Sequence, residues 1–393
     1  MIYIFVLLLL LLLSFRYDIN GMTKGRDESY LIVLIIFILI PGLRWRLGTD
    51  TVSYINNFYH YYPYLSDFSF KFLALGKDPL FALINSIVKS LGGGFYWVQL
   101  IEASIVNVLV FKYIKKHSQY IFTCVLFYYF ISFINYNMEV MRGSISIVIC
   151  LFGNDYIKER KWIKGYFLYF IALMFHSQTI LLFIMPLFFF VKLNKIGIAF
   201  LFGAFLFGFV LKQLLNDYLF LLEDVDTIEN KVDTYSNSER FSEQYPIIQI
   251  LELMFIKVMY PIVSLLYIRR FWNIDKQKEL VTFILFCCAF ALIQVNFPIA
   301  MRYVYYYEVY IAILYSESFV NLLKNIPKLS ISILYVRSII VFFPVFLYFG
   351  YQRYSTRKYH PYSTVIEQSL DKDREKRFKM RESHYFYPRK NEY

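Results

Sequence analysis

The feature that most constrains this 393-residue chain is a series of continuous apolar runs separated by short charged connectors. Runs near the length of a bilayer crossing predict membrane-spanning segments. A barrel would alternate apolar and polar residues, whereas helices satisfy their own backbone in lipid, so these runs predict helices. We therefore predict an all-α, polytopic integral membrane protein with about 12 transmembrane segments. The runs are Ile2–Phe15, Tyr30–Pro41, Phe95–Phe111, Tyr120–Ile134, Ile145–Tyr156, Tyr166–Phe190, Ile196–Leu215, Ile247–Ile268, Leu280–Phe297, Tyr303–Leu323 and Ile331–Phe349.

The composition agrees with a membrane protein and argues against other classes. The residues are 58% hydrophobic and 21% aromatic, unlike those of a soluble domain of this size. The net charge of +12 could suggest nucleic-acid binding, but the basic residues lie mostly in loops, where they set membrane orientation. All four cysteines lie inside apolar runs, where they act as small hydrophobic residues. We expect no nucleic-acid partner, no disulfide framework and no metal site.

The short loops sort by charge, and this sorting predicts the side that each one faces. Connectors rich in Lys and Arg are expected on the cytoplasmic side. Both loops that flank Tyr166–Phe190 are basic, so this run has to cross and return. We predict a tight helical hairpin with His176, in its only polar break, near the outer apex. The basic connectors contain Lys112, Lys115, Lys116, Lys158, Arg160, Lys161, Lys164, Lys192, Lys195, Arg269, Arg270, Lys276, Lys278, Lys324 and Lys328.

The same sorting divides the chain into a membrane domain and a tail. Residues 1–349 are the predicted polytopic membrane domain, with large outward loops over residues 44–94 and 216–246. The first run lacks a basic leader and a cleavage site, so we expect it to stay as the first helix. Residues 350–393 form a charged C-terminal tail that is rich in Lys and Arg. The number of crossings nevertheless places this tail outside.

Polar residues of an unusual kind collect at the outward ends of the predicted spans. The segment Gly42–Asp50 follows the second run and contains Arg44, Arg46 and Asp50. Arginine offers a rigid fork of donors that fits phosphate oxygens, so this segment favours a headgroup or lipid-linked phosphate at the interface. Ionisable residues that share one side of a membrane indicate a functional site. The others on this side are Asn137, Glu139, Arg142, His176, Asn296 and Arg302.

Each of these residues also has a purely structural interpretation. The arginines could anchor helix ends by snorkelling, His176 could bond a backbone carbonyl, and Asp50 could cap a turn. The aromatic stretch Tyr59–Tyr64 could stack on sugars or belong to the interfacial belt. The joint occurrence on one side favours the functional interpretation. The sequence has no P-loop, dinucleotide-binding, metalloprotease or nucleophile-elbow motif, so nucleotide-driven chemistry is not expected.

The sequence resembles the EpsG-like branch of the Wzy-type polysaccharide polymerases. The second half of the sequence matches the family mainly in its pattern of spans, and Arg302 and His360-Pro361-Tyr362 are weaker matches. One departure is visible, because family members commonly carry Gln after the arginine step, where this chain has Gly143 and Ser144. The resemblance rests on Gly42–Asp50 followed by Tyr54, on Asp78-Pro79-Leu80-Phe81, on Asn137 with Met141-Arg142, and on Phe175-His176-Ser177.

The resemblance implies a membrane glycosyltransferase that polymerises undecaprenyl-pyrophosphate-linked oligosaccharide repeats into a surface polysaccharide, such as O-antigen, capsule or exopolysaccharide. It implies a multi-pass protein of the bacterial cytoplasmic membrane that acts at the outer face. Its partners would be the lipid-linked oligosaccharide and the bilayer, with a chain-length regulator and a flippase of the same pathway as further candidates. No cofactor or metal is needed, because the donor already carries a good leaving group. The implied catalytic residues are His176, Asp50 and Arg142, with His176 or Asp50 as base, and the implied substrate-binding residues are Arg44, Arg46, Arg302, Asn137 and Tyr54.

Two other functions remain open. A polyprenyl-phosphate-sugar glycosyltransferase would use an outward aspartate, here Asp50, and would add a single sugar. A flippase or transporter for lipid-linked glycan would show internal repeats and charges near the midplane of the membrane. The sequence has no clear repeat, but Glu308 and Glu317 keep this alternative open.

Overall fold

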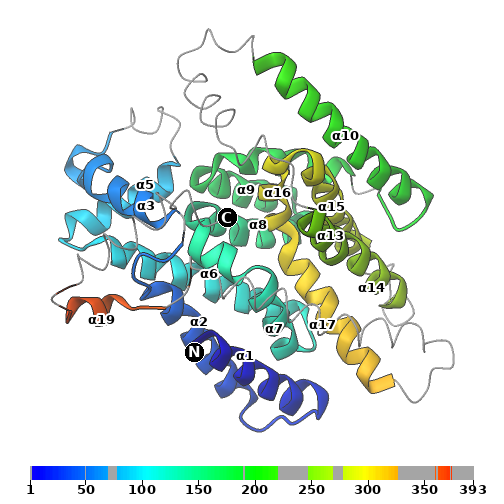
Figure 1. The fold of residues 1–393 in the computed structure, drawn as a ribbon, viewed down its shortest axis with the longest axis horizontal. Helices are drawn as coiled ribbons and strands as arrows, with labels where there is room; N and C mark the ends of the chain where they lie inside the picture. Colours follow the sequence, from blue (N-terminus) through cyan, green and yellow to red (C-terminus); the bar gives the residue numbers. More distant parts are fainter. Residues whose placement is uncertain are drawn as a thin grey trace, which may run out of the picture.

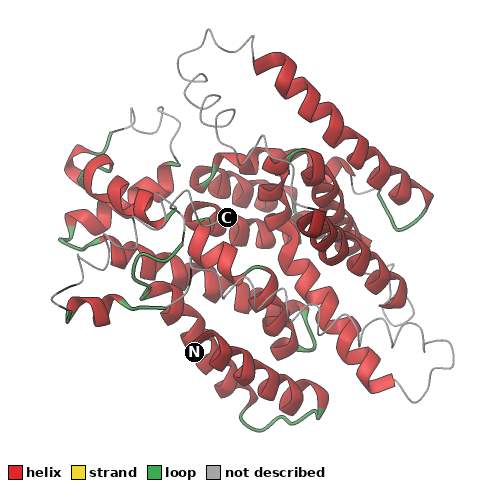
Figure 2. Cartoon of the chain, viewed as in Figure 1, coloured by secondary structure: helices red, strands yellow, loops and turns green. Residues whose placement is uncertain are grey.

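The computed structural model describes residues 2–48, 50–69, 78–188, 191–219, 247–268, 278–325, 359, 362–371 and 373. Across these residues the chain is helical, and its β structure is limited to one isolated antiparallel bridge between Arg44 and Thr364 (Figure 2). The predicted all-α fold is therefore confirmed. The predicted last run Ile331–Phe349, the pair His360-Pro361 and nearly all of the loop 216–246 lie outside the described residues.

The helices form one bundle, with shorter helices at one side and α10 at its outer edge (Figure 1). The α-helices are accompanied by π-helical segments (η1, η2, η4, η6) and 3-10 segments (η3, η5, η8, η9). In chain order the elements are α1 (Ile2–Leu13), η1 (Ser14–Ile19), α2 (Arg26–Gly42), α3 (Thr51–Asn56), η2 (Asn57–Tyr61), η3 (Leu65–Asp67), α5 (Pro79–Ser90), α6 (Phe95–His117), α7 (Ile121–Ile131), η4 (Asn135–Glu139), α8 (Met141–Lys158), α9 (Trp162–Phe175), η5 (Ser177–Phe188), α10 (Lys195–Leu219), α13 (Ile247–Met254), η6 (Phe255–Met259), α14 (Tyr260–Ile268), α15 (Lys278–Asn296), η8 (Pro298–Ala300), α16 (Met301–Val304), η9 (Tyr305–Tyr307), α17 (Glu308–Asn325) and α19 (Val365–Ser369).

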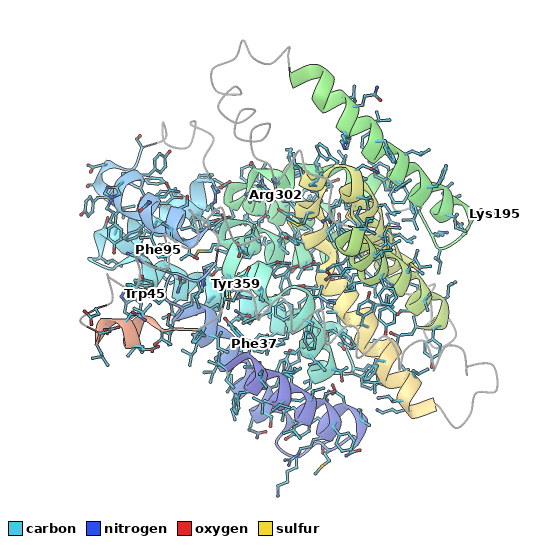
Figure 3. All side chains as sticks on the ribbon, in the orientation of Figure 1. Phe37, Trp45, Phe95, Lys195, Arg302 and Tyr359 are labelled. Carbon is cyan, nitrogen blue, oxygen red and sulfur yellow. The ribbon has the colours of Figure 1, made fainter. Side chains whose placement is uncertain are left out.

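Aromatic side chains fill much of the space between the packed helices. The main helix pairs are α2 with α6, α8 with α9, α7 with α17, and α10 with α15. Phe37 of α2 is fully buried, and its ring centroid lies 5.2 Å from that of Phe111 and 4.7 Å from that of Phe133 (Figure 3). In contrast, α10 exposes large apolar side chains such as Phe202. An apolar helix that is so little covered by protein suits contact with lipid.

Within the described residues, four helical segments are long and apolar enough to cross a membrane: Ile2–Ile19, Phe95–His117, Lys195–Leu214 and Ile250–Ile268. Shorter apolar helices accompany them, including Ile121–Ile131 and Leu280–Asn296. This content of apolar helices agrees with a membrane protein. The number of about 12 crossings stays a prediction, because the four long segments do not reach it.

The predicted hairpin at His176 is present. The helix α9 runs up to Phe175, and η5 begins at Ser177 and returns along it. The Tyr166 hydroxyl donates to the Phe183 carbonyl at 3.3 Å, and the two rings stack with centroids 5.7 Å apart. A 3-10 helix rises about 2 Å per residue, against about 1.5 Å for an α-helix, so the short η5 reaches further than its length suggests.

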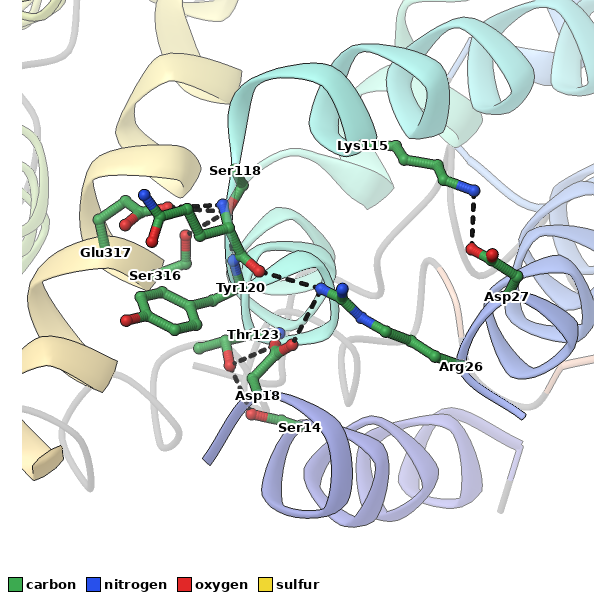
Figure 4. A network of polar contacts seen from close by, with 11 residues as sticks. Ser14, Asp18, Arg26, Asp27, Lys115, Ser118, Tyr120, Thr123, Ser316 and Glu317 are labelled. Atoms are coloured by element: carbon green, nitrogen blue, oxygen red, sulfur yellow. Dashed lines mark hydrogen bonds and ion pairs between the residues drawn. The ribbon is translucent and has the colours of Figure 1, made fainter. Parts of the chain in front are cut away.

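The polar residues gather at two opposite ends of the bundle. At one end, buried Asp18 accepts hydrogen bonds from the backbone and the hydroxyl of Thr123, and Lys115 lies 2.7 Å from Asp27 (Figure 4). Buried Glu317 accepts from the Gln119 amide at 2.8 Å in the same network. This end carries the basic connectors that follow α6 and α8. The other end carries the segment after α2, the start of α8 and the His176 apex, as the charge sorting predicts.

Candidate functional site

Asp78 is the centre of a charged cluster at the end of the bundle opposite the basic connectors. Its Oδ2 accepts a hydrogen bond from Nη1 of Arg142 at 2.6 Å. Its Oδ1 lies 3.7 Å from Nδ1 of His176 and accepts the Ser177 backbone N–H at 3.3 Å. We call these four residues, Asp78, Arg142, His176 and Ser177, the Asp78 cluster. The cluster joins the start of α5, the start of α8 and the apex of the α9–η5 hairpin.

The sequence around Asp78 explains how its carboxylate is held. Pro79 occupies the first turn of α5, where a proline costs no helical hydrogen bond and its fixed φ starts the helix. Burial alone would raise the pKa of the Asp78 carboxyl, but the nearby imidazole of His176 and the charge of Arg142 outweigh burial and lower this pKa below its ordinary value. Asp78 is therefore an anion that is almost covered by its own partners.

Arg142 is the partly open cation of the cluster. It is the second residue of α8, and 36% of its side chain is exposed, against 7% for that of Asp78. Its guanidinium lies over the ring of Tyr54, 5.7 Å from the centroid, which is cation–π geometry. The pairing with Asp78 uses Nη1 alone, so the guanidinium keeps donors that can meet phosphate oxygens.

His176 caps α9 and lies against α8. Its Nε2 is 3.1 Å from the Gln178 amide oxygen, and its Nδ1 faces Asp78. A Cβ built on Gly143 would lie 3.5 Å from Cδ2 of His176, which is ordinary contact. A longer side chain at this position would compete with the imidazole for space. The departure of Gly143 from the expected Gln thus has a local reason.

Arg44 lies at the same end but is completely buried. Its Nη1 donates to the Pro41 carbonyl at 2.7 Å and its Nε to the Leu47 carbonyl at 3.2 Å, so it fastens the turn after α2. Its Nη2 has no hydrogen-bond partner within the described residues. The carboxylates whose charge acts on it are those of Glu102 and Glu139. In this conformation Arg44 therefore organises the segment rather than presenting its charge outward.

A segment from the C-terminal tail covers the Arg44 turn. We call its described residues, 359 and 362–371, the C-terminal strap. The Trp45 N–H donates to the Ser363 carbonyl at 2.9 Å and the Val365 N–H to the Leu43 carbonyl at 2.8 Å, which frames the bridge between Arg44 and Thr364. The Tyr359 hydroxyl donates to Oε1 of Glu139. Figure 3 shows Trp45 beside the short helix α19 of this strap. The strap and the Arg44 turn therefore lie on the same side of the bundle.

The rest of the Gly42–Asp50 segment is shaped by one required glycine. Gly48 has φ +97, and a Cβ there would lie 2.2 Å from the Met138 carbonyl oxygen, so a side chain would push the segment off η4. Arg46 also has a positive φ, and its guanidinium lies 5.1 Å from the ring centroid of Trp45. Asp50 is exposed and directly precedes α3.

Asn137 and Arg302 differ in the hydrogen bonds that they make within the described residues. Buried Asn137 donates to the Phe133 carbonyl and to the Tyr128 hydroxyl, and its oxygen accepts from Asn107 at 2.5 Å. Its amide therefore holds the η4 turn from inside. The Arg302 guanidinium, in α16, has no hydrogen-bond or ion-pair partner among the described residues.

The next segment ties α16 to the site. The Tyr306 hydroxyl lies 3.1 Å from Oγ1 of Thr179 in η5 and 3.3 Å from Oγ of Ser146 in α8. Thr179 follows His176 by three residues, and Ser146 follows Arg142 by four. Tyr306 follows Arg302 by four residues, so these contacts join the three segments about one helical turn away from His176, Arg142 and Arg302.

The sequence analysis assigned no role to two carboxylates, Asp78 and Glu102, that contact residues at or near the start of α8. Asp78 belongs to one of the motifs that carry the family resemblance, and its position before a proline that starts an apolar helix could have drawn attention to it. Glu102 is buried in α6 and accepts from the Ser144 hydroxyl at 2.8 Å. A carboxylate inside an apolar run was the signal there, because such a residue needs a partner in the interior.

The comparisons with known proteins identify the family of this chain. A family model described as the EpsG family matches residues 29–364. The chain belongs to the EpsG family. The earlier resemblance is thereby confirmed. No curated protein and no solved structure matches the chain.

The limits of the EpsG match are informative. The match starts inside α2 and ends at Thr364, the strap residue that pairs with Arg44. It thus includes the whole Asp78 cluster, the Arg44 turn and the first part of the strap, whereas α1 lies outside it. The EpsG family pattern therefore spans the contact between the two ends of the chain. Together with the apolar helices, it is consistent with a membrane protein of the polysaccharide polymerase type.

Proposed function

We propose that this protein is a Wzy-type polymerase. It would transfer a growing glycan from undecaprenyl pyrophosphate to a hydroxyl of the next lipid-linked repeat, at the outer face of the bacterial cytoplasmic membrane. The observation that carries the proposal is the Asp78 cluster, where a partly open guanidinium and an imidazole lie together at the end opposite the basic connectors. Membership of the EpsG family supports it.

The proposed reaction exchanges one C–O bond for another. The acceptor oxygen attacks the anomeric carbon, and the bond from that carbon to the pyrophosphate oxygen breaks. The electron pair leaves with undecaprenyl pyrophosphate, and the acceptor proton passes to a base. Arg142 would bind the pyrophosphate as its charge increases, which lowers the barrier more than binding the ground state alone. Arg302 and Arg46 are further candidate ligands for the two lipid-linked pyrophosphates.

His176 is the preferred base. Its Nε2 lies 3.1 Å from the Gln178 side-chain oxygen in this structure. With the ring hydrogen on Nδ1, toward Asp78, Nε2 would be unprotonated, and the acceptor hydroxyl would displace the Gln178 amide and donate its proton to Nε2. Asp50 is the alternative base, because it is exposed at the end of the Gly42–Asp50 segment. Tyr54 and Asn137 would act by holding Arg142 and η4 in place.

The lipid-linked products of a deletion strain test this proposal. The wild-type gene should restore long polymer, whereas Arg142→Ala and His176→Ala should leave single lipid-linked repeats and lower the polymerisation rate by about 10³-fold. Matched controls are Arg160→Ala, at the opposite end, and His60→Ala, which is exposed in the outward loop. Polymer of normal length from properly inserted Arg142→Ala and His176→Ala proteins would overturn the site.

The same assay separates the two alternative functions. A polyprenyl-phosphate-sugar transferase that uses Asp50 would add one sugar and give no ladder of repeats. A flippase would be inactive without vesicles, so turnover of lipid-linked repeats by protein in detergent excludes it. The carboxylates that favoured transport are already paired, Glu308 with Lys257 at 2.5 Å and Glu317 with the Gln119 amide.

A further inference from the structure

We propose that Asp78 is a positioning residue that holds Arg142 and His176 in a fixed relation for glycan transfer. This inference rests on the proposed function and adds a residue to its site. Asp78 would not touch the substrate, because its carboxylate is covered by the groups that it orients.

The two oxygens of Asp78 serve two different elements. Oδ2 binds Arg142 on α8, and Oδ1 faces His176 and Ser177 at the hairpin apex. A carboxylate accepts hydrogen bonds at both oxygens, so a single group can fix the separation of a cation and an imidazole. Among the described residues, no backbone–backbone hydrogen bond joins α8 to the hairpin apex.

The surroundings of His176 show that Asp78 sets its orientation. Nδ1 of His176 is buried and has no hydrogen-bond partner within the described residues, and the carboxylate of Asp78 is the acceptor in front of it at 3.7 Å. Hydrogen bonds between catalytic groups are often long without substrate and shorten in the reacting complex. With Nδ1 turned to Asp78, Nε2 is the nitrogen that faces the position of Gln178 and can take the acceptor proton.

The surroundings of Arg142 give a second reason for an anion at this place. Its Nε is buried without a hydrogen-bond partner, and its planar group lies between Asp78 and the ring of Tyr54. Without the carboxylate, a half-buried guanidinium would lose its ion pair and could turn toward solvent. A displacement of about 1 Å at such a group can lower a rate about 100-fold.

The position of Asp78 at the start of helix α5 also suits a positioning role. It directly precedes a 12-residue helix that begins with proline and packs against both α6 and α9. Residues placed at the start of a rigid, packed element hold their geometry better than residues in loops. Asp78 is thus held from behind by α5 while its carboxylate reaches α8 and the hairpin apex.

The test compares Asp78→Asn, which keeps the shape and removes the charge, with Asp78→Glu. In a detergent assay with lipid-linked repeats, Asp78→Asn should lower kcat about 100-fold and change KM less. Asp78→Glu should recover part of the rate. Asp67→Asn is the matched control, because Asp67 is exposed in the same outward loop. Adding Asp78→Asn to His176→Ala or Arg142→Ala should lower the rate less than threefold further, since these groups act as a unit.

Two outcomes separate this inference from the proposed function. A wild-type rate in Asp78→Asn, with Arg142→Ala and His176→Ala inactive, would overturn the role of Asp78 and leave the proposed function standing. Wild-type rates in all three variants would overturn both.

A charge swap distinguishes positioning from a structural role. The double variant Asp78→Arg/Arg142→Asp restores the ion pair, so it should insert normally and remain inactive. If this swap restored polymerisation, Asp78 would act only through stability and the inference would fail.

Discussion

The ion pairs Asp78–Arg142 and Lys257–Glu308 are almost equally short, at 2.6 and 2.5 Å, but they lie in different surroundings. Arg142 keeps 36% of its side chain exposed, whereas Lys257 and Glu308 keep 9% and 1%. Asp78 also meets His176 and Ser177, whereas the second oxygen of Glu308 has no hydrogen-bond partner among the described residues.

The difference indicates two uses of charge in one membrane protein. Lys257 lies in a π-helical turn of the candidate span Ile250–Ile268, where an unpaired charge would be costly in lipid. Its pair with Glu308 neutralises both groups inside the bundle. The pair at Asp78 is open on one side, so it can hold a cation ready for an anionic substrate. Four experiments test this contrast, from the largest expected effect to the smallest.

The largest effect is expected from breaking the closed pair. Lys257→Met leaves Glu308 buried without its cation and should lower the free energy of unfolding by about 3–5 kcal/mol. The double variant Lys257→Met/Glu308→Leu should recover most of this loss, because apolar side chains of similar size replace both charges. Thermal unfolding in detergent measures both. Equal losses in the single and double variants would contradict a purely structural pair.

The open pair should respond in activity instead. Arg142→Lys keeps the charge but loses the planar fork that binds phosphate, so the polymerisation rate should fall about 100-fold, which is about 2.7 kcal/mol. The midpoint of thermal unfolding should stay near the wild-type value. Arg160→Lys at the opposite end serves as the control. A stability loss as large as that of Lys257→Met would remove the distinction between the two pairs.

Arg44 sharpens the comparison, because it is as buried as Glu308 yet lies at the end of the Asp78 cluster. Val365→Pro removes the N–H that bonds the Leu43 carbonyl, while proline suits the first position of α19. We expect a loss of about 1 kcal/mol in unfolding free energy and a normal amount of inserted protein. Val365→Ala keeps the N–H and should behave as wild type. Protease digestion near Arg44 should become faster in Val365→Pro alone.

The smallest expected effect is a change with pH in the thermal stability that the Asp78 ion pair contributes. The pKa of Asp78 is lowered in the folded protein, so its ion pair stabilises the fold fully above the unfolded value of 3.8. That contribution is lost as the pH falls through the lower folded value. The difference in unfolding midpoint between wild type and Asp78→Asn should therefore be constant from about pH 7 to 5 and narrow below about pH 4. A difference that narrows already near neutral pH would contradict the stabilising role of the Asp78 carboxylate.

The features of the structure that depend on the local sequence pattern were predictable from the sequence. Continuous apolar runs predicted helices, and two basic loops around Tyr166–Phe190 required the turn at His176. The grouping of Arg142 and His176 at one end followed from the same charges. These features depend on chain length and loop charge, which a single sequence contains.

Those parts that long-range contacts control were not predictable. The carboxylate that joins Arg142 to His176 belongs to a different segment, and nothing local to Asp78 names its partners. The burial of Arg44 depends on a strap more than 300 residues away in sequence, as the bridge to Thr364 shows. The pairing of Lys257 with Glu308 likewise joins two runs whose packing no periodicity specifies. The number of crossings also stays open, because π and 3-10 segments change how far a run of given length extends.

The strap has a consequence for how the protein is made. The ribosome produces the Arg44 turn more than 300 residues before Ser363 and Val365, so the turn waits uncovered while the intervening helices are made. The strap also has to arrive on the same side of the membrane as the turn. A bulky C-terminal fusion that keeps the strap away from the turn would leave Leu43 and Trp45 without their backbone partners, although every helix had inserted. Reporter fusions used to map topology at this terminus would then alter the state that they are meant to record.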